Sequence, residues 1–167
     1  MTHASITDIE DLPQHLARDA RLLGLDVGTK TIGLALSDVT RRVATPFDTI
    51  RRTKFTADAK RIREVVEKNQ VGALVIGLPL NLDGSEGPRA QSTRAFARNL
   101  GPHVEVPMVF WDERLSTAAV KRHLIEAGAS RKRRAEVVDR MAAAYILQGA
   151  LERLRRIPLR AAPDRPT

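Results

Sequence analysis

Asp26 is the residue in this sequence that most needs a chemical explanation. It follows the apolar residues Leu22, Leu23 and Leu25 in the segment LLGLDVG, whose pattern is typical of a buried strand. An ionised carboxylate in an apolar layer is strongly disfavoured unless a cation or hydrogen-bond donors meet it. A divalent metal ion is one such partner. An ordinary turn or a phosphate-binding loop built on Asp26-x-Gly28 is the alternative that this segment leaves open.

Two further acidic segments are candidates for the same site. Asp112 and Glu113 follow the apolar run VEVPMVFW, and as sequence neighbours they point to opposite faces, so only one of them can join Asp26. Asp139 heads a stripe of mostly small apolar residues at helical spacing, namely Ala142, Ala143, Ile146 and Ala150. Taken singly, the first pair also fits a helix cap with a surface salt bridge, and Asp139 also fits a first-turn residue favoured by the helix dipole.

Three acids on a strand, after the last strand and near the start of the last helix are what a two-metal nuclease site requires. Two Mg²⁺ or Mn²⁺ ions about 3.5–4 Å apart hold the attacking water and the leaving oxygen of a phosphodiester. The ions also relieve the repulsion among the acids. We therefore interpret Asp26 as a carboxylate that is tolerated because a metal ion neutralises it.

The hydrophobic patterning predicts the elements that position these acids. We expect strands at 21–27, 31–37, 43–50, 72–78 and 104–111. We expect helices at 56–70 with Thr56 as its cap, from the loop PLNLDGSEG to about Leu100, at 117–127, and at 135–155 after a basic linker, GASRKRR. The order β-β-β-α-β-α-β-α-α predicts an α/β fold with a mixed five-stranded sheet and helices on both faces. Sites in such sheets gather at the carboxyl ends of parallel strands.

Length and composition indicate one domain. The chain has 167 residues, of which we assign 21–156 to the domain, 1–20 to a loosely held leader and 157–167 to a flexible tail. It contains no cysteine, which excludes disulfides, thiolate metal sites and a catalytic thiol. The start lacks the pattern of a signal peptide and no apolar run has membrane-spanning length, so we expect a cytoplasmic protein with no membrane partner.

The charge is unevenly distributed along the chain. The formal net charge is +8, with residues 1–20 carrying −3 and residues 121–160 carrying +7. A domain charged in this way attracts polyanions, and nucleic acid is the commonest polyanion in the cytosol. A solvated arginine-rich face is the alternative. Aromatic residues make up only 4% of the chain, which argues against recognition of single strands by base stacking.

The sequence resembles the YqgF/RuvX family, whose members have an RNase H-like (RuvC-like) fold and are described as Holliday junction resolvases and as pre-16S rRNA nucleases. Four segments carry the resemblance and lie within residues 21–155: LGLDVGTKTIGLALSD, VIGLPLNLDGSEGPRA, DERLSTAAVKRHLIEAG and VVDRMAAAYILQGALE. The resemblance implies a cytoplasmic hydrolase of phosphodiester bonds that uses Mg²⁺ or Mn²⁺ and takes part in maturing the 5′ end of 16S rRNA. By position it assigns Asp26, Glu113 and Asp139 as the catalytic, metal-binding acids.

One departure from related resolvases concerns the last helix. Those proteins place a further acid or histidine one helical turn from the last catalytic aspartate, whereas this chain has Ala142 and Ala143 there. Glu136 is a weak substitute, one turn earlier. A site with three acids would hold its second ion only when the substrate phosphate supplies ligands, so we expect turnover to be slow or strongly dependent on the substrate.

Supporting residues surround these acids in the sequence. Thr29 and Lys30 lie in the turn after Asp26, and Asn81 lies in the loop after the fourth strand; each is a candidate nucleic-acid contact, with a plain turn and a solvated loop as alternatives. Arg114 either contacts a phosphate or pairs with Asp112, and we favour pairing. The run Arg131, Lys132, Arg133 and Arg134 precedes the last acid and is a candidate guide for a nucleic-acid backbone. Trp111 is expected in the core.

Three other functions stay open from the sequence. A DNA junction resolvase needs two sites in a symmetric dimer, and no feature of the sequence decides whether this chain dimerises. An actin-like or sugar-kinase ATPase needs two such domains, and this chain supplies one. A non-catalytic RNA-binding module in ribosome assembly would bind structured RNA without metal and cut nothing with it.

Overall fold

A five-stranded mixed sheet forms the centre of the protein. The computed structural model describes residues 5–114 and 131–158, with 131–137 described by their backbone alone. The strands are β1 (Arg21–Val27), β2 (Thr31–Ser37), β3 (Ala44–Arg51), β4 (Val71–Leu78) and β5 (Met108–Asp112). Their order in the sheet is β3-β2-β1-β4-β5. The pairs β1–β2 and β2–β3 are antiparallel and the pairs β1–β4 and β4–β5 are parallel, which confirms the predicted mixed sheet.

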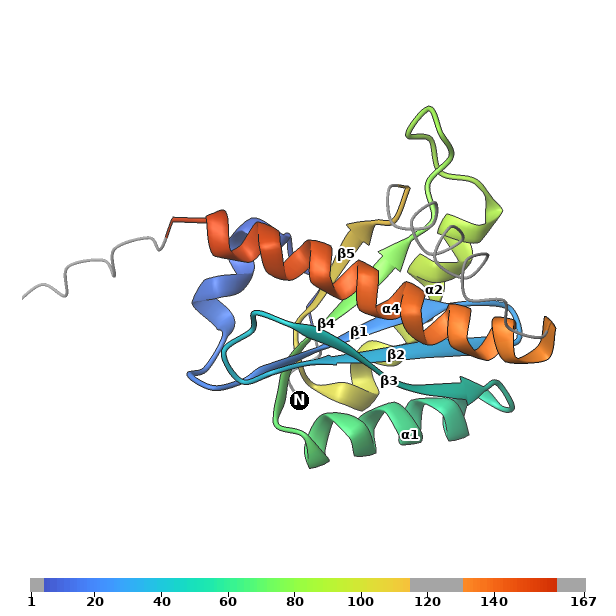
Figure 1. Ribbon diagram of the computed structural model, residues 1–167, viewed down its shortest axis with the longest axis horizontal. Helices are drawn as coiled ribbons and strands as arrows, with labels where there is room; N and C mark the ends of the chain where they lie inside the picture. Colours follow the sequence, from blue (N-terminus) through green and yellow to red (C-terminus); the bar gives the residue numbers. More distant parts are fainter. Residues whose placement is uncertain (1–4, 115–130, 159–167) are drawn as a thin grey trace, which may run out of the picture.

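Helices cover both faces of the sheet, as predicted (Figure 1). On one face lie α1 (Phe55–Lys68) and α2 (Pro88–Val104), and α4 (Arg131–Arg156) runs across the other. A short 3-10 helix, η1 (Ile9–His15), packs with α4. Among the helices that the structure describes, none combines the length and the apolar character needed to cross a membrane.

Each face of the sheet has its own hydrophobic core, because strand side chains alternate between the two faces. On the α1–α2 side, Leu23 and Leu25 of β1 pack with Ile62 of α1 and Phe96 of α2. On the α4 side, the smaller residues Ala35, Ala73 and Val75 face the predicted helical stripe, of which Ala143, Ile146 and Ala150 are fully or almost fully buried. The two cores therefore differ in side-chain size, and the helix on the second face comes closer to the strands.

Two glycines let α4 lie against the backbone of the sheet. A Cβ built on Gly24 of β1 would lie 2.8 Å from Cβ of Leu147 and 2.9 Å from the backbone oxygen of Ala143. A Cβ built on Gly33 of β2 would lie only 1.9 Å from the backbone oxygen of Asp139. Any side chain at these positions would push the helix away from the sheet.

Several predicted element boundaries differ from the structure. β5 begins four residues later than expected, because α2 continues to Val104 and ends at Glu105, which has a left-handed backbone with φ 55°. Thr56 does not cap α1: the helix begins at Phe55, and the Asp58 side chain instead accepts a hydrogen bond from the backbone N–H of Thr53 at 3.2 Å. The helix predicted at 117–127 lies outside the described residues.

The basic run was wrongly assigned to a linker. Residues 131–134 form the start of α4, because arginine and lysine are good helix formers and extend the helix in the amino-terminal direction. Asp139 consequently lies in the third turn of α4, whereas the sequence predicts it near the start of the helix. The run is therefore held by the same rigid element as Asp139.

The expectation of a loosely held leader is wrong for residues 5–20. Leu12 of η1 is completely buried in the core beneath α4, and Arg153 of α4 donates a hydrogen bond of 2.9 Å from Nε to Glu10. Ile6 forms a parallel bridge with Met108 at the open edge of β5. The leader covers one end of the α4 core and part of this sheet edge.

We predict that Gly33→Ala lowers the free energy of unfolding by about 3 kcal/mol, because a methyl group at this position collides with the α4 backbone. Urea denaturation monitored by circular dichroism measures the change. Gly87→Ala is the matched control, since its Cβ would meet only the side chain of Asn81, at 3.3 Å. Equal stability of the two variants would contradict the close seating of α4.

Candidate metal and nucleic-acid site

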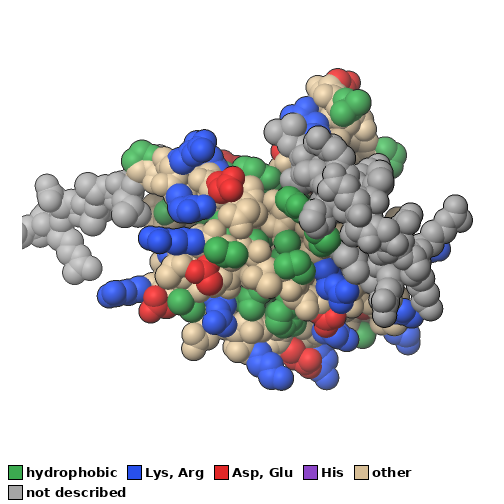
Figure 2. Space-filling view, in the orientation of Figure 1, with side chains coloured by type: hydrophobic (Ala, Val, Ile, Leu, Met, Phe, Trp, Pro, Cys, Tyr) green, Lys and Arg blue, Asp and Glu red, His purple; other side chains and the backbone are tan. Residues whose placement is uncertain are grey.

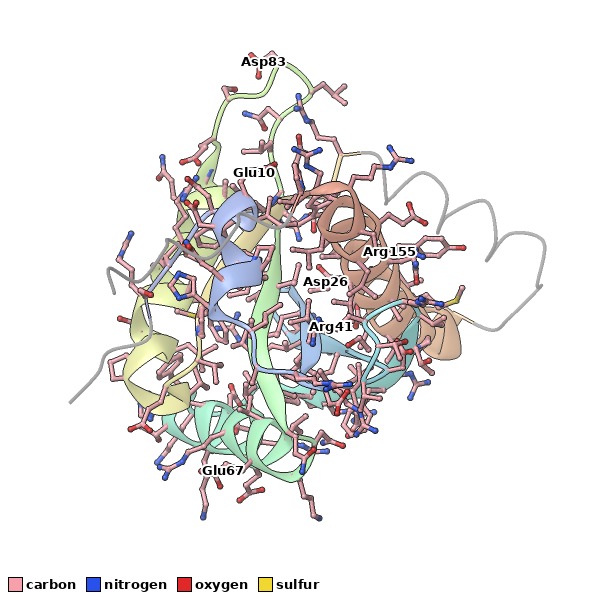
Figure 3. All side chains as sticks on the ribbon, turned by 90° about the vertical axis from the view of Figure 1, so that its left-hand side faces the viewer. Glu10, Asp26, Arg41, Glu67, Asp83 and Arg155 are labelled. Carbon is pink, nitrogen blue, oxygen red and sulfur yellow. The ribbon has the colours of Figure 1, made fainter. Side chains whose placement is uncertain are left out.

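Asp26 lies near the carboxyl end of β1 with a glycine beside it on each neighbouring strand. It pairs with Gly33 of β2, and the preceding Leu25 pairs with Ile76 of β4, which places Gly77 alongside Asp26. The Asp26 side chain is mostly buried, and Figure 3 shows it in the interior of the molecule. Because the two glycines have no side chains, groups from other elements can approach Asp26 from both sides.

Asp139 approaches from the α4 side. Its backbone lies directly over Gly33, so the helix crosses β2 at the position that pairs with Asp26. The hydroxyl of Thr31, the first residue of β2, donates a hydrogen bond of 2.6 Å to Oδ2 of Asp139. The helix position and this hydroxyl together hold the Asp139 carboxylate near Asp26.

Glu113 approaches from the β5 side. A Cβ built on Gly77 would lie 2.6 Å from Oε2 of Glu113, so this carboxylate occupies the space above the glycine. The neighbouring Asp112 is engaged elsewhere, with its Oδ2 at 2.6 Å from Nη2 of Arg114. The structure thus confirms that only one of the two acidic neighbours joins Asp26, and that Arg114 pairs with Asp112.

Burial and neighbouring negative charges raise the proton affinity of Asp26 and Glu113. Burial, followed by the negative charges of Glu113 and Asp139, raises the pKa of Asp26 from 3.8 to about 7, against a lowering influence of Arg89. Burial also raises the pKa of Glu113; Arg89 opposes this increase and Asp112 adds to it. Among the described residues, the ionised form of Asp26 therefore lacks sufficient positive charge around it, which is the condition that a bound cation would relieve.

The donor set suits a hard divalent cation that retains water. Within residues 5–114 and the described side chains of α4, no group of three or more histidine, cysteine, aspartate or glutamate side chains is arranged to hold a metal ion, and this includes Asp26, Glu113 and Asp139. Mg²⁺ does not need such a group, because it usually keeps several waters and binds through one or two carboxylates together with substrate phosphates. Asp26, Glu113 and Asp139 would be the protein ligands in such an open site. The side chain of Glu136, the weak substitute, lies outside the described ones.

A projecting loop, residues 79–87, borders the site on the β4–α2 side. It stands out from the body of the molecule in Figure 1 and in the space-filling view of Figure 2, and Asp83 marks its tip in Figure 3. Asn81 donates a hydrogen bond of 3.0 Å to the Ser85 hydroxyl, and Nη1 of Arg114 reaches the backbone oxygen of Leu82 at 3.3 Å. These bonds preorganise the loop and join it to the end of β5.

A cavity of about 270 Å³ lies at the base of this loop. Its lining includes Asn81, Arg89, Glu113 and Arg114, so it brings the loop, the start of α2 and one of the three acids together. The predicted contact Asn81 thus reaches the edge of the site. The cavity is open to a ligand that approaches Glu113 from solvent.

The remaining predicted residues take different positions. Thr29 and Lys30 have exposed side chains in the turn after β1, which the backbone hydrogen bond from Gly28 N–H to Thr31 oxygen closes at 2.8 Å. The side chains of residues 131–134 lie outside the described ones. Trp111 belongs to the core on the α4 side, as expected, and its indole ring lies against Gly149 of α4.

Sequence reasoning missed four residues that build the site: Thr31, Gly33, Gly77 and Arg89. Glycines inside apolar strands signal a close approach of another backbone or side chain, so Gly33 and Gly77 carried a readable signal. Thr31 and Arg89 carried none, because their roles depend on where α4 and the start of α2 lie in space.

Known proteins resemble this chain over most of its length. Residues 20–153 match the RuvX family, described as Holliday junction resolvase. A protein of Methylocella silvestris named "Putative pre-16S rRNA nuclease" is 64% identical over 154 residues, which cover 92% of this chain and 96% of that protein. A protein of the same name from Paramagnetospirillum magneticum is 66% identical over 142 residues, which cover 85% of this chain and 92% of that protein.

A solved structure shares the fold at low sequence identity. T. thermophilus RuvC in complex with a Holliday junction substrate superimposes with a TM-score of 0.53 and 14% identity, covering 83% of this chain and 97% of that chain. This similarity supports the RNase H-like, RuvC-like architecture, with its mixed sheet and helices on both faces. Family identity comes from the sequence matches: the chain belongs to the RuvX family.

Proposed function

We propose that this protein is a divalent-metal-dependent endonuclease that processes the 5′ end of pre-16S rRNA in the cytoplasm, with Asp26, Glu113 and Asp139 as its metal-binding acids. The observation that carries the proposal is the position of Asp26, mostly buried and influenced by two further carboxylates, with its pKa raised to about 7. Membership of the RuvX family supports the general activity, hydrolysis of phosphodiester bonds. The names of the relatives support the substrate.

The chemistry of the site follows from its acids. A bound Mg²⁺ or Mn²⁺ ion would activate water and stabilise negative charge on the phosphodiester. Asp26 supplies a ligand from the rigid centre of the sheet, and Asp139 supplies one whose carboxylate is oriented by the Thr31 hydroxyl. Glu113 lies over Gly77 and would supply the third ligand. It also lines the cavity from which substrate can enter.

The description of the family as Holliday junction resolvase favours a second candidate, cleavage of branched DNA. The similarity to RuvC concerns the fold alone. A fold does not determine the substrate, so the fold is compatible with both RNA and branched DNA. The two candidates share the same acids and differ in the nucleic acid that must fit around them. A comparison of substrates therefore separates them.

We predict that Asp26→Asn, Glu113→Gln and Asp139→Asn each lower metal-dependent hydrolysis by about two orders of magnitude or more, because each removes a charged ligand while conserving shape. The assay offers a precursor 16S rRNA 5′ leader and a four-way DNA junction to each protein with Mg²⁺, Mn²⁺ or EDTA. Asp48→Asn is the control, an aspartate that pairs with Arg61 on the surface.

Cleavage of the RNA by wild type but not by the three variants supports the proposal, and preferential cleavage of the junction favours the resolvase. Full activity of any variant removes that acid from the site. Binding of both substrates with no cleavage of either would contradict the proposal that the isolated chain is a nuclease. A non-catalytic RNA-binding function would then remain.

We predict that Asp26→Asn stabilises the metal-free protein by about 2 kcal/mol above a pH of about 7. The folded protein holds the Asp26 proton more tightly than the unfolded chain, so this contribution favours folding at low pH. It is lost as the pH rises from 3.8 to about 7. Urea unfolding in EDTA across this range measures the difference, which should vanish near the lower limit.

The same experiment with added Mg²⁺ tests the ligand role, because metal binding requires the deprotonated acid. The ion should raise the midpoint of thermal unfolding for wild type above a pH of about 7 and leave Asp26→Asn unchanged. A variant no more stable than wild type at any pH would contradict the unfavourable burial of Asp26.

We predict that replacing Arg131, Lys132, Arg133 and Arg134 by glutamine weakens RNA binding and flattens its dependence on salt, because fewer counterions are released. Filter binding of the RNA leader over a series of KCl concentrations gives the slope. An unchanged slope would show that these four residues do not take part in RNA binding.

A further inference from the structure

The cavity beside Glu113 contains two arginines with different surroundings. Arg114 is fully engaged: its Nε lies 2.8 Å and its Nη2 lies 2.6 Å from Oδ2 of Asp112, and its Nη1 reaches the backbone oxygen of Leu82 at 3.3 Å. These contacts hold the loop against the end of β5. Arg114 is therefore structural, and its guanidinium is not available to a ligand without breaking the loop anchor.

Arg89 contrasts with Arg114 in every one of these respects. It is the second residue of α2, is exposed, and forms no salt bridge with any carboxylate in the part of the chain that the structure describes. Its charge nevertheless acts on both Asp26 and Glu113. Arg89 is thus a cation placed near the acids without being neutralised by either of them.

The acids create a need for such a cation. Three carboxylates repel the phosphate backbone of a nucleic acid, so a substrate reaches them only where local positive charge compensates. A guanidinium binds a phosphate with two parallel hydrogen bonds, a geometry that a lysine cannot reproduce. The cavity of about 270 Å³ has room for a phosphate group.

We propose that Arg89 binds a backbone phosphate of the nucleic-acid substrate in this cavity and thereby positions the neighbouring phosphodiester at Asp26 and Glu113. The inference deepens the proposed function and rests on it. The amide of Asn81 borders the same cavity and is fixed by its hydrogen bond to Ser85, so the phosphate meets a preformed wall. Binding requires no rearrangement of the loop, because Arg114 already anchors it.

The test measures binding without catalysis. Fluorescence anisotropy of a labelled RNA leader, in EDTA and at several KCl concentrations, compares wild type with Arg89→Gln, Arg89→Lys and Arg98→Gln. Arg98 is the matched control, an exposed arginine on the same helix outside the cavity lining. Thermal unfolding of each variant confirms that the fold is kept.

We expect Arg89→Gln to weaken binding about tenfold and to reduce the salt slope by about one, with Arg98→Gln close to wild type. Arg89→Lys should keep the slope and lose part of the affinity, because it keeps the charge but not the paired hydrogen bonds. If Arg89 acted only through its charge on the acids, Arg89→Lys would bind RNA in EDTA as well as wild type, and the proposal would fail. Equal losses of RNA affinity in Arg89→Gln and Arg98→Gln would also overturn the proposal, since they would show that any positive charge on this helix contributes equally.

The outcome is separable from that of the proposed function. Asp26→Asn, measured in the same binding assay, should bind RNA at least as well as wild type, because it removes a negative charge. A wild-type protein that cuts neither substrate yet loses affinity on Arg89→Gln would contradict the nuclease proposal and keep the phosphate contact. A protein that cuts RNA and binds it independently of Arg89 would support the nuclease proposal and contradict the phosphate contact.

Discussion

The contact between α4 and the bare backbone of the sheet is the constraint on which the rest of the structure depends. It exists because β1 and β2 present Gly24 and Gly33 to the helix, and because the helix presents Ala143 and other small residues in return. This contact brings the Asp139 backbone over the residue that pairs with Asp26. The packing of the core and the arrangement of the candidate site therefore depend on the same contact, and the same glycines serve both.

The site stores an electrostatic imbalance that the fold has to offset. Asp26 is surrounded by apolar strand residues and two acids, and Arg89 compensates this charge only in part. The stability needed to hold such a group comes from the two apolar cores on either side of the sheet. The role proposed for Asp26 and the stability of the fold therefore oppose each other, as is common where ionisable groups are placed for chemistry.

Local patterns predicted the parts of the fold that depend on local sequence. The strands at 21–27 and 31–37 coincide with β1 and β2, because apolar alternation and a short turn define them. The packed leader escaped prediction, since the burial of Leu12 depends on the distant carboxyl-terminal half of α4. Arg89 escaped for the same reason: only the folded loop brings the start of α2 beside Glu113. Asp26 and Glu113 were singled out because an acid within or after an apolar strand is conspicuous without any knowledge of its neighbours. Asp139 was singled out because it heads a stripe of small apolar residues at helical spacing.

The last residue of β5, Asp112, and the two residues that follow it have two different tasks. Asp112 and Arg114 bind each other and hold the projecting loop, while Glu113 between them points to Gly77 and the acids. In an extended chain, successive side chains point to opposite sides, so this division depends on which position each residue occupies. A single inserted or deleted residue near the end of β5 would exchange the two roles, turning a loop anchor into the site and the site acid toward the loop. The length of the chain at the end of β5 is therefore constrained by two functions at once, the loop anchor and the position of Glu113.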